Sequence, residues 1–193
     1  MRIGVLALQG AFREHCDAVR RIGHEAVEVR TPADLASVDG LILPGGESTT
    51  IDKLLDSSGL RAPLAARLEA GMPAFGTCAG LIVLSASAVD GTPDQRTLGA
   101  IDVVSQRNGF GRQVKSFEAP VTLIGDSTTM PGVFIRAPRI VSVGEDVEVI
   151  ARLADEPVAA TSRTIMVATF HPELTDDDRL HRRFAALVEA KEY

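Results

Sequence analysis

The sequence predicts a three-layer α/β domain with a doubly wound, largely parallel sheet and a cysteine at a sharp strand-to-helix turn. A length of 193 residues suits a single domain covering 1–193. In the first half of the chain, short apolar runs alternate with stretches of helical period, which is typical of parallel strands joined by helices. Glycine-rich turns follow several of these runs, and such turns often carry functional residues.

The first half of the chain contains four predicted strands, and helical sequence is predicted after the first, third and fourth of them. Residues 3–8 are continuously apolar, as expected for a strand buried on both faces. Residues 11–22 then show apolar positions at helical spacing, and Gly23 supplies a C-terminal cap. Ser48 stands where a helix N-cap is expected. The remaining predicted elements are strands at 26–29, 40–43 and 74–77, and helices at 49–55, 62–69 and 79–86.

After Gly91 the pattern changes to short strands separated by turns. A final helix is expected over residues 178–190. The sequence contains no internal repeat, low-complexity segment or linker that would divide it. The predicted strands of this half cover residues 98–104, 114–117, 121–124, 133–135, 140–143, 147–153 and 164–170.

Charge and composition exclude several classes of protein. The net charge is −6, whereas a nucleic-acid groove needs a basic face. The two cysteines, Cys16 and Cys78, cannot form a disulfide framework and favour a reducing compartment. No apolar stretch has the length of a membrane span, and no His/Cys cluster has metal-ligand spacing. We therefore expect a soluble, cytoplasmic protein that binds no metal.

The segment Gly76-Thr77-Cys78-Ala79-Gly80 has the layout of a nucleophile elbow, with cysteine in the place of serine. A tight turn between a strand and a helix crowds the backbone, so glycines flank it. The start of the following helix would stabilise a thiolate at Cys78, and the amide of Ala79 would face a developing oxyanion. A free cysteine is most often a buried apolar residue, and we interpret Cys16 on its helical stripe in that way.

A second candidate is Phe170-His171-Pro172-Glu173, at the end of an apolar strand. The residue before a proline is extended, and positions two apart in extended chain face the same way. Glu173 is therefore expected to orient the imidazole of His171, although by itself the segment could be a surface turn. The other histidines, His15, His24 and His181, are interpreted as solvated residues on helices or turns.

Three further loops are candidates for substrate contacts. Pro44-Gly45-Gly46-Glu47-Ser48 follows a buried strand and could present backbone amides to an anion, or could be a tight turn with a capping serine. Arg107 and Arg136 each lie in a loop bounded by glycine or proline. Either arginine could hold a carboxylate with two parallel hydrogen bonds, or could be a solvated surface charge.

Together these segments resemble the class I-type glutamine amidotransferases, which have a flavodoxin-like fold. Within them the chain is similar to the glutaminase subunits of the two-protein pyridoxal 5'-phosphate synthase. GTCAG and HPE indicate only the broad superfamily, whereas LALQGAFREH, the RN-FGRQ stretch and FIRAP single out this family. One departure is Gly109, where the family pattern predicts alanine. The matching segments are GVLALQGAFREH (4–15), LPGGEST (43–49), FGTCAGL (75–81), RNGFGRQVKSFE (107–118), FIRAP (134–138) and FHPE (170–173).

The resemblance implies a role for each matching residue. Cys78 would be the nucleophile and His171 the general acid and base, with Glu173 orienting His171. The amides of Gly46 and Ala79 would form the oxyanion hole. The expected glutamine-binding residues are Gly46, Glu47, Ser48, Arg107, Ile135 and Arg136.

The resemblance also implies a partner. The N-terminal segment, including Gln9, would contact a PdxS-like, ring-shaped synthase subunit in a large hetero-oligomer. Ammonia released from glutamine would pass to that subunit for vitamin B6 synthesis, and no cofactor is implied. We expect low activity without the partner, because Gly45-Gly46 leaves the oxyanion loop flexible. The rival interpretations are an enzyme of another substrate class, such as a peptidase or deglycase, and a subunit that only docks.

Overall fold

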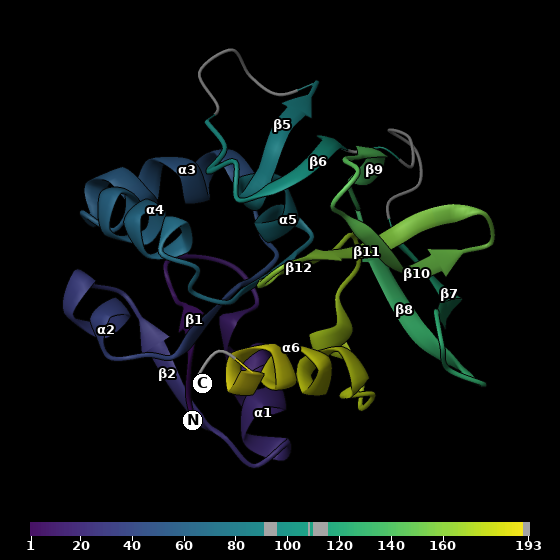
Figure 1. The fold of residues 1–193 in the computed structure, drawn as a ribbon, viewed down its shortest axis with the longest axis horizontal. Coiled ribbons are helices and arrows are strands. Elements are labelled where there is room, and N and C mark those ends of the chain that lie inside the picture. Colours follow the sequence, from purple (N-terminus) through teal and green to yellow (C-terminus); the bar gives the residue numbers. More distant parts are fainter. Residues whose placement is uncertain (91–95, 108, 110–115, 191–193) are drawn as a thin grey trace.

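The structure, a computed structural model, describes residues 1–90, 96–107, 109 and 116–190. The fold is a sheet sandwiched between helices, with a second, smaller sheet beside it (Figure 1). In chain order the elements are β1 (Arg2–Leu6), α1 (Phe12–Arg21), β2 (Glu25–Val29), α2 (Pro32–Ala36), β3 (Gly40–Leu43), α3 (Ser48–Ser57), α4 (Arg61–Glu69), β4 (Ala74–Thr77), α5 (Ala79–Leu84), β5 (Ser85–Val89), β6 (Ile101–Gln106), β7 (Ser116–Leu123), β8 (Thr129–Ile135), β9 (Arg139–Val143), β10 (Glu148–Leu153), β11 (Glu156–Ser162), β12 (Ile165–Ala168), a 3-10 turn (Pro172–Leu174) and α6 (Arg179–Ala190).

The larger sheet has the order β2-β1-β3-β4-β12-β11-β10-β7-β8. Strands β2, β1, β3, β4 and β12 pair in parallel, in a doubly wound arrangement. From β12 onward the neighbours are antiparallel. The predicted parallel sheet is therefore confirmed for the half that carries β4 and β12, whose carboxyl ends lead directly into Cys78 and His171.

The predicted three layers are present. Helices α1 and α6 cover one face of the parallel half, and α3, α4 and α5 cover the other (Figure 1). Phe75 and Phe184 are completely buried on the α1/α6 side, and Leu55 and Leu81 on the opposite side. Each such side chain removed from water contributes about 1.5–3 kcal/mol to folding. This packing holds the turns at the carboxyl ends of the strands rigidly in place.

Several elements differ from the sequence prediction. The helix expected over 79–86 ends at Leu84, where the Ser85 hydroxyl donates a 2.8 Å hydrogen bond to the Leu81 carbonyl, and the chain continues as β5 in parallel with β6. The strands predicted at 114–117 and 121–124 belong to one strand, β7, although residues 114 and 115 lie outside the described part of the chain. Helix α2 and strand β11 were not predicted.

Candidate functional site

Cys78 lies at the turn between β4 and α5, as the elbow pattern predicts. Its backbone has φ 48° and ψ −105°, in a region that residues with a side chain rarely occupy. The flanking glycines are required by close packing: a Cβ at Gly76 would overlap the Gly80 carbonyl, and a Cβ at Gly80 would overlap the Leu43 carbonyl of β3. The turn therefore presses α5 against β3 and leaves the Cys78 side chain 7% exposed at the sheet edge.

His171 and Glu173 come from the segment that follows β12. The Nδ1 atom of His171 lies 2.7 Å from Oε1 of Glu173, and both residues are almost fully buried. His171 lies outside the helical region, as expected before proline, but with φ −107° and ψ 85° it is not fully extended. Glu173 itself lies in a 3-10 turn, so the carboxylate reaches the imidazole across that turn and not along extended chain. The predicted contact is present, although its geometric reason was different.

The electrostatics of this cluster favour an ion pair. Burial alone would lower the pKa of His171, but hydrogen bonds to Cys78 and Glu173 raise that pKa to about 10. Burial works to raise the pKa of Glu173, and the nearby His15 and His171 more than reverse it, so the net shift is downward. His171 is thus an imidazolium at neutral pH, between a carboxylate and the thiol of Cys78. A cation beside a thiol stabilises the thiolate, the nucleophilic form of cysteine.

The loop after β3 approaches the same point. A Cβ at Gly45 would overlap the His171 ring and lie 3.2 Å from the Cβ of Cys78. The amide oxygen of Gln9 accepts a 2.8 Å hydrogen bond from the backbone N–H of Glu47 and packs against Gly46. Gln9, expected at the partner contact, therefore also connects the N-terminal segment to the loop that contains Gly46 and Glu47.

The predicted N-cap at Ser48 is wrong, because Glu47 caps α3. The Glu47 carboxylate accepts backbone N–H bonds from Thr49 at 3.0 Å and Thr50 at 2.7 Å, whereas Ser48 lies within the first turn and is 3% exposed. Burial opposes ionisation of Glu47, but the Thr50 and Thr49 hydrogen bonds outweigh it and lower its pKa to about 2. The side chain of Glu47 is longer than that of serine, so it reaches two backbone amides, and it brings a negative charge to the positive end of the helix.

The residues expected to bind glutamine share one small pocket with the cysteine. Arg107 donates to the Glu47 carboxylate at 3.1 Å and to the Thr49 hydroxyl at 3.3 Å. Arg136 has φ 44°, a strained value for a residue with a side chain. The cavity measures about 60 Å³, and sequence reasoning missed two of its residues, Ile82 and Pro138. The pocket is lined by Gly46, Glu47, Ser48, Cys78, Ala79, Ile82, Arg107, Ile135, Arg136 and Pro138.

Two histidines interpreted as solvated are in fact buried beside the cluster. His15 is 0% exposed and His181 1% exposed, and their Nδ1 and Nε2 atoms lie 2.9 Å apart. The Nε2 atom of His15 lies 3.0 Å from the Thr77 hydroxyl and 3.3 Å from Oε2 of Glu173. The signal that could have found them is helical spacing: His15 shares the apolar stripe of Phe12, Cys16 and Val19, and His181 that of Phe184, Ala185 and Val188.

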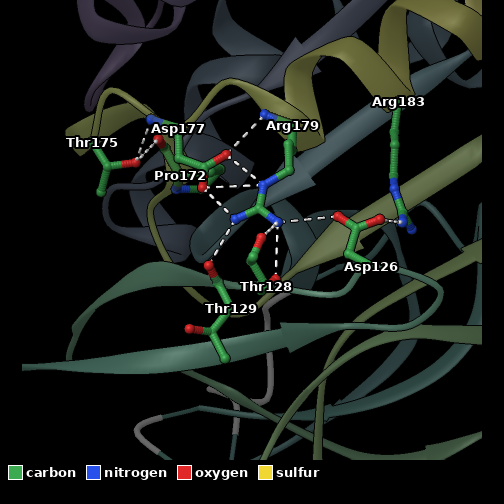
Figure 2. Close-up of polar contacts among 8 residues, drawn as sticks. All are labelled: Asp126, Thr128, Thr129, Pro172, Thr175, Asp177, Arg179 and Arg183. Atoms are coloured by element: carbon green, nitrogen blue, oxygen red, sulfur yellow. Dashed lines mark hydrogen bonds and ion pairs between the residues drawn. The ribbon is translucent and has the colours of Figure 1, made fainter.

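Arg179 anchors the segment that carries the histidine and the glutamate. Its guanidinium donates to Asp126 at 3.1 Å and to the Thr129 carbonyl at 2.8 Å, in and beside the turn between β7 and β8 (Figure 2). It also binds Asp177 at 2.6 Å, and Arg183 reaches Asp126 at 3.2 Å (Figure 2). These bonds connect the parallel half of the sheet, through the start of α6, to the antiparallel half.

Two further findings concern the described residues alone. None of their His, Cys, Asp and Glu side chains form a group of three or more that could hold a metal ion. No helix in this part of the chain is long and apolar enough to cross a membrane.

Comparisons with known proteins agree with this geometry. Residues 5–190 match the SNO glutamine amidotransferase family. Relatives described as pyridoxal 5'-phosphate synthase subunit PdxT include one from Parafrankia sp. (strain EAN1pec), 51% identical over 98% of this chain and 94% of the relative. Another, from Acidothermus cellulolyticus, is 53% identical over 98% of this chain and 95% of the relative.

Solved structures show the same fold. A crystal structure of a glutamine amidotransferase superposes with a TM-score of 0.91 and 49% identity, over 97% of this chain and 98% of that one. PurLQS from Thermotoga maritima, at 15% identity and a TM-score of 0.67, covers 100% of this chain and 99% of its own and shows only that the fold is shared. From its sequence, its fold and the cluster at Cys78, the chain belongs to the SNO glutamine amidotransferase family.

Proposed function

We propose that this protein hydrolyses L-glutamine to L-glutamate and ammonia, and that it supplies the ammonia to a pyridoxal 5'-phosphate synthase. The observation that carries the proposal is the contact of His171 with both Glu173 and Cys78, the last of which lines the pocket. Family membership and relatives described as PdxT support the pathway. Both cysteines are free, which fits a reducing cytoplasm.

The proposed reaction follows from the positions of these groups. The Cys78 thiolate attacks the side-chain amide carbon of glutamine, and the negative charge moves onto the amide oxygen. The backbone amides of Gly46 and Ala79 stabilise that oxyanion, each by a factor of about 10²–10³ in rate. His171, already protonated, gives its proton to the departing ammonia and leaves a thioester on Cys78. Neutral His171 then takes a proton from water, which attacks the thioester and releases glutamate.

Charged side chains around the pocket suit an amino-acid substrate. Arg107 and Arg136 offer two cationic groups for the α-carboxylate, and Glu47 offers an anionic group for the α-ammonium. Ser48 and the carbonyl of Ile135 complete the proposed binding set. A peptidase or deglycase would not need two arginines placed for a free carboxylate, so this charge pattern favours glutamine.

The dimensions of the pocket support the expectation that the isolated chain turns over slowly. A cavity of about 60 Å³ has room for only a few water molecules, and a whole glutamine is larger. The N–H of Glu47 is bonded to Gln9, so movement of the N-terminal segment by a partner would reach the oxyanion loop directly. We propose that a PdxS-like, ring-shaped synthase subunit binds there and opens the site.

The test is glutamate release from glutamine by the purified chain, alone and with a pyridoxal 5'-phosphate synthase subunit. We expect slow release alone, a large increase with the partner, and none from Cys78→Ala under either condition. Cys16→Ala is the matched control, because Cys16 is buried in α1 and away from the pocket. Equal rates with and without the partner would contradict the proposal that the partner opens the site. If the complex releases no glutamate, the protein is better explained as a subunit that only docks or as an enzyme that acts on another class of substrate.

A further inference from the structure

The carboxylate that orients His171 rests on a buried pair of histidines. His15 of α1 contacts His181 of α6 through one ring nitrogen, and through the other it contacts Thr77 of β4 and Oε2 of Glu173. His15 and Glu173 have side chains that are 0% exposed, and their atoms Nε2 and Oε2 lie 3.3 Å apart. None of these contacts has a role in the reaction as proposed above.

The hydrogen-bond pattern assigns a proton to each ring. The Nδ1 atom of His181 is buried and has no hydrogen-bond partner among the described residues. A buried N–H without an acceptor is costly, so the His181 proton belongs on Nε2, where it is donated to Nδ1 of His15 at 2.9 Å. Nδ1 of His15 is then an acceptor, and the proton of that ring lies on Nε2, facing Thr77 and Glu173.

Burial favours the neutral form of both rings in the folded protein. Burial lowers the pKa of His15, against the attraction of Glu173, with a further lowering from His171 and a small opposing effect of Glu14. Burial and the neighbouring His15 lower the pKa of His181 to about 3, with Glu173 opposing and Arg21 adding to the decrease. The two rings therefore supply N–H dipoles and no positive charge.

We propose that His15 and His181 are positioning residues for Glu173: His181 orients His15, and the N–H of His15, bonded to Thr77, lies 3.3 Å from Oε2 of Glu173. The inference rests on the proposed glutaminase reaction and names two side chains that serve it. Oε2 of Glu173 is fully buried and receives no well-aligned hydrogen bond among the described residues, and the ring N–H of His15 lies 3.3 Å from it. A cation at this position would compete with His171 for the carboxylate, whereas a neutral donor leaves the full negative charge to His171.

The first test is a spectroscopic reading of the protons on the intact protein. Nitrogen-15 NMR of histidine-labelled protein, assigned with single variants, reports the charge and tautomer of each ring and does not depend on turnover. We expect His15 and His181 to be neutral Nε2–H tautomers between pH 7 and pH 8. A charged His15, or an Nδ1–H tautomer of either ring, would overturn the proposal even if glutamine hydrolysis is confirmed.

The second test compares two substitutions of His15 in the complex with the synthase subunit. His15→Phe keeps a ring but removes the donor, so kcat should fall about tenfold to a hundredfold, with KM changed less than about threefold. His15→Gln keeps an N–H near the position of Nε2 and should retain most of kcat. His24→Gln, on the turn before β2, is the control and should leave both constants unchanged.

A third measurement separates a structural role from a positioning role. The rate at which iodoacetamide alkylates Cys78 at pH 7 reports how readily that cysteine reacts as a thiolate. The measurement needs no glutamine, so it remains informative if the protein does not hydrolyse glutamine. We expect slower alkylation in His15→Phe and nearly wild-type alkylation in His15→Gln, with circular dichroism showing both folded. A folded His15→Phe with wild-type kcat and alkylation, or equal losses in the two variants, would refute the positioning role.

Discussion

Mild acid should destabilise this protein through the buried histidine His181. In the native state its pKa is about 3, whereas in the unfolded chain the value is 6.5. A folded-state pKa below the unfolded one gives stability that is present above pH 6.5 and lost as the pH falls, because only the unfolded chain then binds the proton. The native ring remains neutral down to pH 4, so the full effect develops in the range where the protein is still folded.

The magnitude follows from proton linkage. Between pH 7 and pH 5 the unfolded His181 gains most of one proton and the native one gains none, which lowers the free energy of unfolding by about 2 kcal/mol. His15 acts in the same direction, since its pKa is also lowered. His171 acts oppositely: its pKa of about 10 gives stability that is complete below pH 6.5, so acidification from pH 7 to pH 5 adds about 1 kcal/mol.

The contribution of His181 can be isolated by comparison with His181→Gln, which keeps an N–H donor and does not titrate. Urea unfolding followed by circular dichroism at pH 7, 6 and 5 suits a chain with no Trp and one Tyr. The loss of stability from pH 7 to pH 5 should be about 2 kcal/mol smaller in His181→Gln than in the wild type. His24→Gln, at a half-buried turn position, should follow the wild type. Equal pH dependence in wild type and His181→Gln would refute a buried, neutral His181.

Three other predictions follow from the site. Cys78→Ala should abolish glutamate release from the complex while the melting temperature stays within a few degrees, and release at the wild-type rate would end the nucleophile assignment. Glu173→Gln should lower kcat by about 10²–10⁴, because the amide cannot stabilise the His171 imidazolium, and an unchanged kcat would contradict that role. Glu47→Ala removes two helix-capping bonds and should lower the free energy of unfolding by about 1 kcal/mol in urea titrations, whereas the exposed Glu145→Ala should change it by less than about 0.5 kcal/mol.

Features decided by a few neighbouring residues were predicted well. The bounds of β3 and β4 agree with the sequence to the residue, since β3 ends before Pro44 and β4 begins after Pro73. The elbow at Cys78 was predictable because a side chain at either flanking glycine would collide with nearby backbone atoms. Helix α2 was missed although Thr31 and Asp34 form a capping box, and β11 was missed because Glu156–Ser162 has little apolar period.

By itself, the sequence determined most of the strands and helices of the first half and the elbow around Cys78, since steric limits and side-chain period act over a few residues. It also indicated the contact of His171 with Glu173, but not the 3-10 turn that forms it. Only the tertiary structure decided what surrounds them. It placed Glu47 on the helix amides, joined β5 to β6, and buried His15 against His181, which lies 166 positions away in the chain. A polar residue on an apolar stripe has no local signal for its partner, because that partner comes from another element and the cost of burying both is met only when the two elements pack together.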